Sequence, residues 1–301
     1  MPISLDCMLC LTRQSLEAAR FATDDEAKHA AVFKQTLDIV REKGFSVIPP
    51  LLAQEIQRII RRETVNADPY TAQKQESNEL MLALADSLRE RIRQAHDPIR
   101  AAVQTAIAGN SIDYAVRGDW NKETLRQAFE NALQAPINGS VKLFAEGLKH
   151  AKQVLYLLDN CGEIVCDQIM IEEIKRHYPH LSVIAAVRGS AVLNDAVLAD
   201  AESIGLHKTV PVITNGNDAV GTVLEQCSRE FMNVFHQSDV IIAKGLANYE
   251  TLVEYDRTHL PQTVYYLFKA KCAFIAKYAG VSLGDAVLQT RFVPTSPSAG
   301  Q

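Results

Sequence analysis

The spacing of apolar residues changes near residue 150 and divides the chain into two parts. Between about residues 24 and 150, apolar residues recur every three or four positions, as in DDEAKHAAVFKQTLDIVREKG, LLAQEIQRIIRRE and QESNELMLALADSLRERIRQAH. This spacing is typical of amphipathic helices, and prolines between these segments mark helix starts and stops. No convincing strand interrupts the pattern. We therefore predict an N-terminal helical bundle domain over residues 1–150.

From residue 152 the pattern changes to short apolar runs that alternate with amphipathic stretches. The runs QVLYLLDN, LSVIAAVRG, DVIIAKG and TVYYLFKAK each have the length of one buried strand. Such alternation indicates a Rossmann-like, doubly wound α/β fold with a mostly parallel sheet over residues 151–290. We expect a disordered tail over 291–301. The predicted strands lie near residues 153–158, 182–187, 209–213, 239–243 and 263–268.

Composition and charge narrow the classes of function. The chain has 301 residues, of which 47% are hydrophobic and 22% are charged, as in globular proteins. A formal net charge of -5 argues against a nucleic-acid partner. Because no stretch approaches the ~20 apolar residues that cross a bilayer and the N-terminus lacks a signal-peptide pattern, we expect a cytoplasmic protein without a membrane partner. The six dispersed cysteines favour reduced thiols.

The strongest chemical signal follows the first predicted strand, in the segment LLDNCGE. Asp159 and Asn160 end this strand, and Gly162 allows a sharp turn into a helix whose first N–H groups suit a phosphate. Since neighbouring parallel strands end side by side, Asp195 after the next strand is expected to approach both residues. Three oxygen ligands suit magnesium or manganese better than zinc. The alternative at each position is a plain helix cap.

Lysines follow two other predicted strands. Lys244 and Asn248 come after one strand, and Lys269 ends another. A lysine ammonium beside a metal offsets charge on a transferring phosphoryl group, and we assign this role to Lys269. We expect its competitor Lys271 to point elsewhere. The alternative for any of these lysines is a solvated surface position.

Two further motifs have weaker signals. Asn110 interrupts a predicted helix, with Asp113 one turn later, which on sequence grounds is a plain interhelical turn. Cys7 and Cys10 form a single CxxC that lacks a second pair for zinc and a thioredoxin-like context, so neither a metal nor a redox role is favoured. The cysteines that we expect to be small buried residues are Cys161, Cys166 and Cys272.

The segments CMLC, GNSID, DNCGE, RGSAVLNDA, KGLANYETL and KAKC occur in this order along nearly the whole chain. Together they resemble the damage-control phosphatase family, formerly domain of unknown function 89, in its compact prokaryotic branch with an N-terminal CxxC. The resemblance implies a helical bundle against an α/β domain and a metal-dependent phosphatase of phosphorylated metabolites. It implies that Asp159, Asn160 and Asp195 are metal ligands and that Asn110 and Lys269 lie around the phosphate. The other residues that it places along the site are Asp113, Glu163, Arg188, Lys244, Asn248 and Glu250.

Two segments depart from the pattern of that family. KGLANYE differs from the more usual KGQGNYE at Leu246 and Ala247, and DNCGE has Cys161 where alanine is common. Neither departure touches the implied metal ligands. Because Leu246 removes a polar group, substrate selectivity is the property that we expect these changes to affect.

These signals lead to one hypothesis and two alternatives. The hypothesis is a hydrolase of phosphate monoesters, in which a divalent cation (magnesium, manganese, cobalt or nickel) acts as Lewis acid and Lys269 stabilises the phosphoryl group. The alternatives are an S-adenosylmethionine-dependent carboxyl methyltransferase and a non-catalytic sensor of sugar phosphates or nucleotides. The expected partner is a small phosphorylated metabolite, either a sugar phosphate or a damaged or phosphorylated cofactor fragment. The sequence leaves open the substrate, the metal, the attacking group and the oligomeric state.

Overall fold

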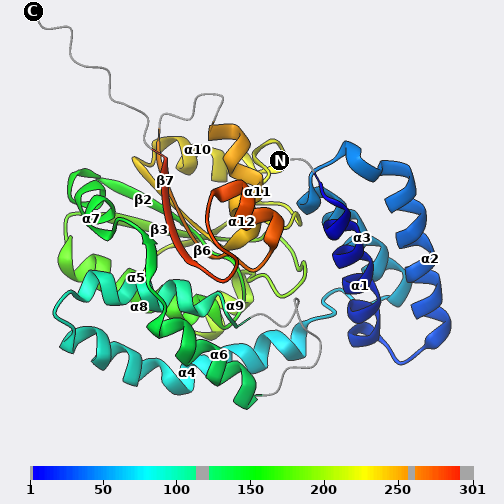
Figure 1. Ribbon diagram of the computed structural model, residues 1–301, viewed down its shortest axis with the longest axis horizontal. Coiled ribbons are helices and arrows are strands. Elements are labelled where there is room, and N and C mark those ends of the chain that lie inside the picture. The colour runs from blue at the N-terminus through cyan, green and yellow to red at the C-terminus, as the bar shows by residue number, and fades with distance from the viewer. Residues whose placement is uncertain (1–2, 113–121, 257–261, 292–301) are drawn as a thin grey trace, which may run out of the picture.

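The computed structural model describes residues 3–112, 122–256 and 262–291 (Figure 1). Its first three helices, α1 (Leu5–Ala22), α2 (Glu26–Lys43) and α3 (Pro49–Thr64), form a bundle at one side of the molecule, with the 3-10 helix η1 (Gly44–Ser46) before α3. Helix α1 begins before the segment whose spacing predicted helices. Its buried face consists largely of small residues, which give a weak hydrophobic period: Leu11, Ser15, Ala18 and Ala19.

The next helices pack against the sheet rather than against the bundle. They are α4 (Thr71–Gln94), α5 (Pro98–Gly109), α6 (Lys122–Gln134) and α7 (Val141–His150). Buried residues of all four belong to the same core as the sheet and α8 (Glu163–His177), whereas α1 and α3 share a separate core. Residues 1–150 therefore divide between two hydrophobic cores.

A seven-stranded sheet forms the centre of the molecule. Its strands are β1 (Ile137–Gly139), β2 (Gln153–Leu157), β3 (Ser182–Val187), β4 (Val212–Thr214), β5 (Val240–Lys244), β6 (Thr263–Lys269) and β7 (Ala286–Arg291). The spatial order is β1-β7-β6-β5-β2-β3-β4, and within it only β7 runs antiparallel to a neighbour, β6. The predicted mostly parallel α/β sheet is confirmed. The prediction that no strand precedes residue 150 is wrong, because β1 joins the edge of the sheet beside β7.

Helices cover both faces of this sheet. Along β2, Val154 and Tyr156 face the core shared with α5 and α8, and Leu155 and Leu157 face the opposite core, as the two-residue period of a strand requires. The second face carries α10 (Arg229–Gln237), α11 (Gly245–Asp256) and α12 (Ala273–Ala279). From β2 the chain passes to β3 on one side and later to β5 on the other, so the strand order reverses between β2 and β5. Open α/β sheets bind ligands at this switch point.

A polar contact holds the bundle to the α/β part. Asp218, in the loop between β4 and the 3-10 helix η3 (Leu224–Gln226), accepts hydrogen bonds from three side chains of α3. The donors are Gln54 at 2.8 Å, Arg58 at 2.6 and 2.9 Å, and Arg61 at 2.5 Å.

The loop after β3 leads into the short helix α9 (Leu198–Ser203) and η2 (Leu206–Lys208).

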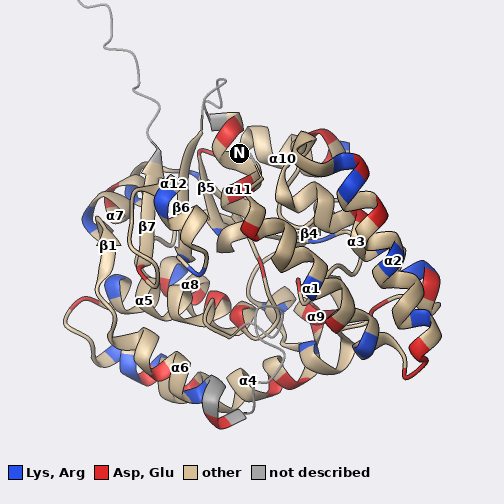
Figure 2. Ribbon diagram, turned by 45° about the vertical axis from the view of Figure 1, so that its right-hand side comes forward, with Lys and Arg blue, Asp and Glu red and all other residues tan. Residues whose placement is uncertain are grey.

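The surface mixes charges of both signs. Figure 2 shows Lys and Arg interspersed with Asp and Glu along α2, α4 and α6. Within the described ranges, no helix is both long enough and apolar enough to cross a membrane.

Candidate active site

Backbone hydrogen bonds draw together the two loops that carry the acidic residues. Ala196 N–H donates to the carbonyl of Asp159 at 2.8 Å, and Cys161 N–H donates to the carbonyl of Asn194 at 2.9 Å. Asn160 and Asp195 form an isolated antiparallel bridge between these contacts. The predicted approach of Asp195 to Asp159 is therefore present at the ends of β2 and β3.

Arg188 is the counter-ion of both buried carboxylates. Its Nε donates to Asp195 Oδ2 at 2.6 Å, and a terminal nitrogen donates to Asp159 Oδ1 at 3.1 Å. Burial, followed by the charge of Asp195, raises the pKa of Asp159, and Arg188 opposes this shift. Because two buried carboxyl groups share one guanidinium, a bound cation would favour the charged form of Asp159.

Two glycines allow the backbone to approach these groups. Gly245, which begins α11, has φ +76°, and a Cβ there would lie 1.8 Å from Asp159 Oδ2. Gly162 has φ +81° at the start of α8. Its N–H, which the sequence suggested for a phosphate, instead donates to Asn78 Oδ1 of α4 at 2.6 Å. Sequence reasoning missed Asn78, because the contact joins residues 84 positions apart.

Lys244 lies beneath the site rather than along it. Its ammonium donates to Glu163 Oε1 and Asp167 Oδ1, each at 2.7 Å, and to the Ala106 carbonyl at 2.9 Å. All three ionic side chains are buried, with 0% exposure for Lys244 and Glu163. Charge pairing therefore accounts for Lys244 and Glu163, and neither contacts the cavity described below.

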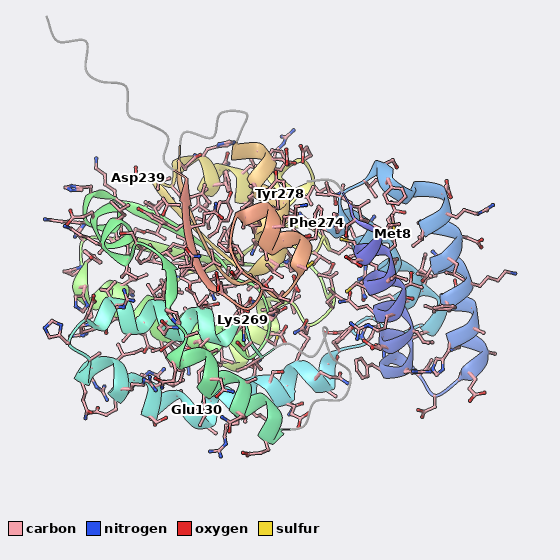
Figure 3. All side chains as sticks on the ribbon, in the orientation of Figure 1. Met8, Glu130, Asp239, Lys269, Phe274 and Tyr278 are labelled. Atoms are coloured by element: carbon pink, nitrogen blue, oxygen red, sulfur yellow. The ribbon has the colours of Figure 1, made fainter. Side chains whose placement is uncertain are left out.

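The buried cluster of Lys244, Glu163 and Asp167 extends through Glu163 to Asn110, which caps the end of α5. Asn110 Nδ2 donates to Glu163 Oε2 at 2.7 Å, and its Oδ1 accepts from Lys269 N–H at 3.1 Å. The Lys269 ammonium lies 3.3 Å from Ser111 Oγ, at the end of β6 that faces α5 (Figure 3). The GNSID segment is therefore tied to the strand ends, and it is more than the plain turn predicted from sequence. Asp113 lies outside the described residues.

Asn248, like Lys244, is fully buried and makes its hydrogen bonds within the protein. Its amide donates to the carbonyls of Leu158 and Lys244 at 3.2 and 2.8 Å, and its oxygen accepts from Thr222 at 2.8 Å. Arg188 also donates to this oxygen, at 3.4 Å. Asn248 thus joins the ends of β2 and β5 and helps to hold the guanidinium of Arg188 in place.

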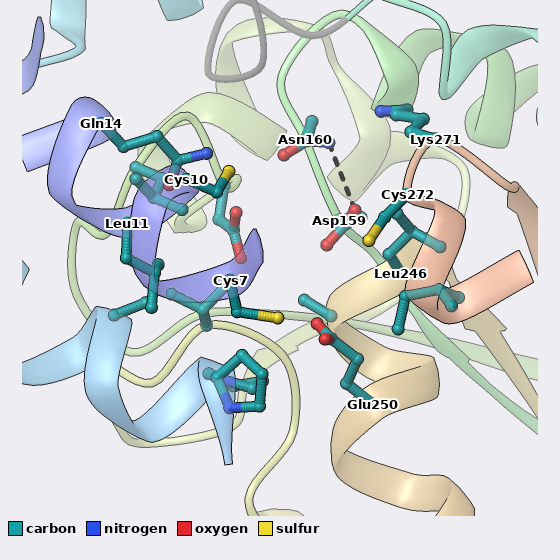
Figure 4. A pocket seen from close by; sticks show the side chains of 18 of the residues that line it. Cys7, Cys10, Leu11, Gln14, Asp159, Asn160, Leu246, Glu250, Lys271 and Cys272 are labelled. Carbon is teal, nitrogen blue, oxygen red and sulfur yellow. Dashed lines mark hydrogen bonds between the residues drawn. The ribbon is translucent and has the colours of Figure 1, made fainter. Parts of the chain in front are cut away.

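A cavity of about 390 Å³ opens beside Asp159 and Asn160, with α1 and α3 forming its opposite wall (Figure 4). Of the residues predicted for the site, it brings together Asn110, Asp159, Asn160, Asp195 and Glu250. The predicted site residues that are not among its described lining residues are Glu163, Arg188, Lys244, Asn248 and Lys269.

Residues that were not predicted for the site also line this cavity. Lys271 does so, contrary to the prediction that it points elsewhere, and its charge opposes the rise in the pKa of Asp159 that burial and Asp195 cause. Cys7, Cys10 and Cys272 line it from α1 and from the start of α12. Cys272 is half-buried rather than the fully buried residue predicted, whereas Cys161 and Cys166 are buried as predicted.

The oxygen-bearing side chains of the site have the chemistry that a hard divalent cation prefers. Asp159, Asn160 and Asp195 are 5%, 5% and 2% exposed, and all three line the cavity. Asn160 uses its amide nitrogen to donate to Asp159 Oδ2 at 3.2 Å, so the nitrogen and not the side-chain oxygen is turned to that carboxylate. Over the described ranges, no group of three or more His, Cys, Asp or Glu side chains is placed to hold a metal. Two carboxylates and one amide suit an ion such as magnesium, which keeps several waters and takes substrate phosphate as a ligand.

The chain matches one protein family over nearly its whole length. The sequence profile of the damage-control phosphatase ARMT1-like domain matches residues 3–287. The chain belongs to this family. The predicted family resemblance is therefore confirmed, whereas the assignment to a branch with an N-terminal CxxC stays a prediction.

Relatives match nearly the whole chain. It is 36% identical to an uncharacterized protein of Methanocaldococcus jannaschii, with 96% of this chain and 95% of the relative covered. It is 32% identical to proteins named damage-control phosphatase in Pyrococcus horikoshii (95% and 97% covered) and Archaeoglobus fulgidus (95% and 98%). The crystal structure of a DUF89 family protein from Pyrococcus horikoshii matches with a TM-score of 0.85 at 30% identity, covering 96% of this chain and 99% of that one.

Proposed function

We propose that this protein is a divalent-metal-dependent phosphatase of small phosphorylated metabolites. The observation that carries the proposal is the convergence of Asp159, Asn160 and Asp195 on one cavity at the switch point of the sheet. Two relatives named damage-control phosphatase support this choice over a methyltransferase or a sensor.

Asp159, Asn160 and Asp195 would hold magnesium, manganese, cobalt or nickel. When bound, such an ion supplies Lewis-acid stabilisation of the phosphate oxygens. Arg188 fixes the directions of the two carboxylates through its bonds at 2.6 and 3.1 Å. Because Arg188 does not line the cavity, we assign it to positioning rather than to phosphate contact.

Asn110 and the two lysines after β6 would surround the phosphate. One amide hydrogen of Asn110 is used by Glu163, and the second is directed to a phosphate oxygen in our proposal. Lys271 offsets phosphoryl charge from within the cavity, and Lys269 acts through its contacts with Asn110 and Ser111. Lys271→Ala should therefore lower kcat more than Lys269→Ala, and the reverse order would return the main role to Lys269.

Asp159 also lies where a nucleophile or base is needed. It either attacks phosphorus and forms a phosphoaspartate, or it orients and deprotonates a water. Rapid quenching with a ³²P-labelled ester separates these routes. Label carried by the Asp159 carboxylate, located by peptide mapping of the quenched protein, supports covalent attack, and inversion at phosphorus without labelling supports direct attack by water.

Phosphate release from p-nitrophenyl phosphate tests the proposed function. Metal-stripped protein should be inactive, and addition of one of the four cations should restore release. Addition of S-adenosylmethionine should have no effect. If no cation supports release while a phosphorylated metabolite still binds tightly, the protein is a sensor and the proposal is wrong.

A further inference from the structure

The cavity has two chemically different ends. One end carries the oxygen ligands of β2 and β3, with Asn110 and Lys271 beside them. The other end is built from α1, α3, α11 and the start of α12, and most of the surface lining the cavity is apolar. A phosphate ester bound at the polar end must therefore place its organic part against this second end.

Four separate helices supply apolar side chains to the second end. Leu11 comes from α1, Pro49 and Pro50 come from the first turn of α3, and Ile275 comes from α12. Leu246 projects into the cavity from α11, between Glu250 and Cys272 (Figure 4). Agreement among separate segments indicates that the apolar character belongs to the binding surface and not to one exposed residue.

The polar groups at this end carry little charge into it. Burial raises the pKa of Glu250 to about 8 and raises the pKa of the Cys10 thiol, so both are mainly neutral at pH 7. The charged residues Asp6 and Arg13 of α1 are exposed, which places them at the rim. The Glu250 carboxyl makes no hydrogen bond with any residue that the structure describes, and it lies across from Cys7 (Figure 4). It is suited to one hydrogen bond with a ligand.

We propose that this cavity selects phosphate esters with a compact, largely apolar organic part over polyhydroxylated sugar phosphates, and that Leu246 is a residue that determines this preference. The proposal rests on the phosphatase function proposed above. Sugar hydroxyls placed against Leu246, Leu11 and Ile275 would lose hydrogen bonds to water without replacement. An added methylene group, by contrast, would gain from burial against the same side chains.

Two esters of matched shape test the preference. Cyclohexylmethyl phosphate and glucose 6-phosphate both place a six-membered ring one carbon from the phosphate, and they differ in the hydroxyls and the ring oxygen. With the metal-loaded wild type, kcat/KM should be higher for cyclohexylmethyl phosphate by about tenfold or more. Equal or reversed values would overturn the inference while leaving the phosphatase function intact. No metal-dependent release from either ester or from p-nitrophenyl phosphate would overturn both.

Leu246→Gln tests the residue itself, since glutamine has a similar size and adds hydrogen-bonding groups. It should narrow the ratio between the two esters by about tenfold, chiefly through KM, without changing which cations support release. Leu143→Gln is the matched control, because Leu143 is 47% exposed on α7. It should keep the wild-type ratio. A ratio unchanged in Leu246→Gln would overturn the role of Leu246.

Discussion

Lys244 offers a sharp test of the buried charge cluster beneath the site. Lys244→Met keeps the apolar stem and removes the ammonium, so Glu163, Asp167 and the Ala106 carbonyl lose their common donor. Removing one partner of a buried ion pair costs about 3–5 kcal/mol. Burial, opposed chiefly by Lys244, leaves the pKa of Asp167 raised to about 7. Because the Asp167 carboxyl can take up a proton once the lysine is lost, we expect the loss of unfolding free energy at pH 7 to lie in the lower half of that range, at about 3–4 kcal/mol.

The assay is thermal unfolding at pH 7, followed by circular dichroism. A loss of about 3–4 kcal/mol should lower Tm by roughly 6–16 °C, at the ~2–4 °C per kcal/mol that applies to chains of about 150–250 residues. Lys43→Met is the matched control, because Lys43 pairs with Glu55 at the surface, with 34% and 28% of the two side chains exposed. Such pairs contribute about 0.2–1 kcal/mol. Equal melting temperatures for the two variants would refute the account of Lys244 as a buried counter-ion.

Three further changes have expected outcomes. Gly245→Ala should abolish phosphate release, because the added Cβ would displace Asp159. Gly280→Ala is the control, since Gly280 has φ +72° and a Cβ there would meet no atom within 4 Å, so this variant should keep activity. Equal activities of the two variants would contradict the argument. Burial raises the pKa of Glu250 from 4.5 to about 8. Between these pH values the folded protein holds a proton that the unfolded chain releases, so stability falls as pH rises from 4.5 to about 8. In urea unfolding, the midpoint of Glu250→Gln should therefore decrease less over this pH range than the midpoint of the wild type. Burial acts to raise the pKa of Asp218, but hydrogen bonds from α3 hold this pKa below 3.8. The stability that the contact contributes is therefore fully present above pH 3.8 and is lost as the pH falls below it. Asp218→Asn should lower Tm at pH 7 and should have a smaller effect on Tm at pH 2.

The sequence predicted the sheet and its acidic residues because both depend on local patterns. The runs that became β2, β3, β5 and β6 are continuous and apolar, and Asp159 and Asp195 follow two adjacent strands. β1 and β7 escaped prediction because each is stabilised by pairing with a distant segment, as Ile137 pairs with Ala286. Short strands of this kind carry little periodic signal.

The sequence could not decide which strand-end residues face the cavity. Lys244 and Lys271 both follow apolar strands, but Lys244 is covered by Ala106 of α5 and Glu163 of α8, and Lys271 is not. That difference depends on how α5 packs over the sheet, which no local pattern encodes. The wall formed by α1 and α3 was missed for the same reason, since its residues meet the site only through tertiary packing.

The central claim is that Asp159, Asn160 and Asp195 hold the cation on which phosphate release depends. Its most direct test is calorimetric titration of metal-stripped protein with manganese, paired with phosphate release at each point, for wild type, Asp159→Asn and Asp239→Asn. Asp239 is an exposed aspartate before β5, whose carboxylate caps the N–H groups of Lys152 and Gln153. We predict that manganese binding and release rise together in wild type and Asp239→Asn and that both are lost in Asp159→Asn. Undiminished manganese binding by Asp159→Asn, or release that does not follow metal occupancy, would contradict the claim.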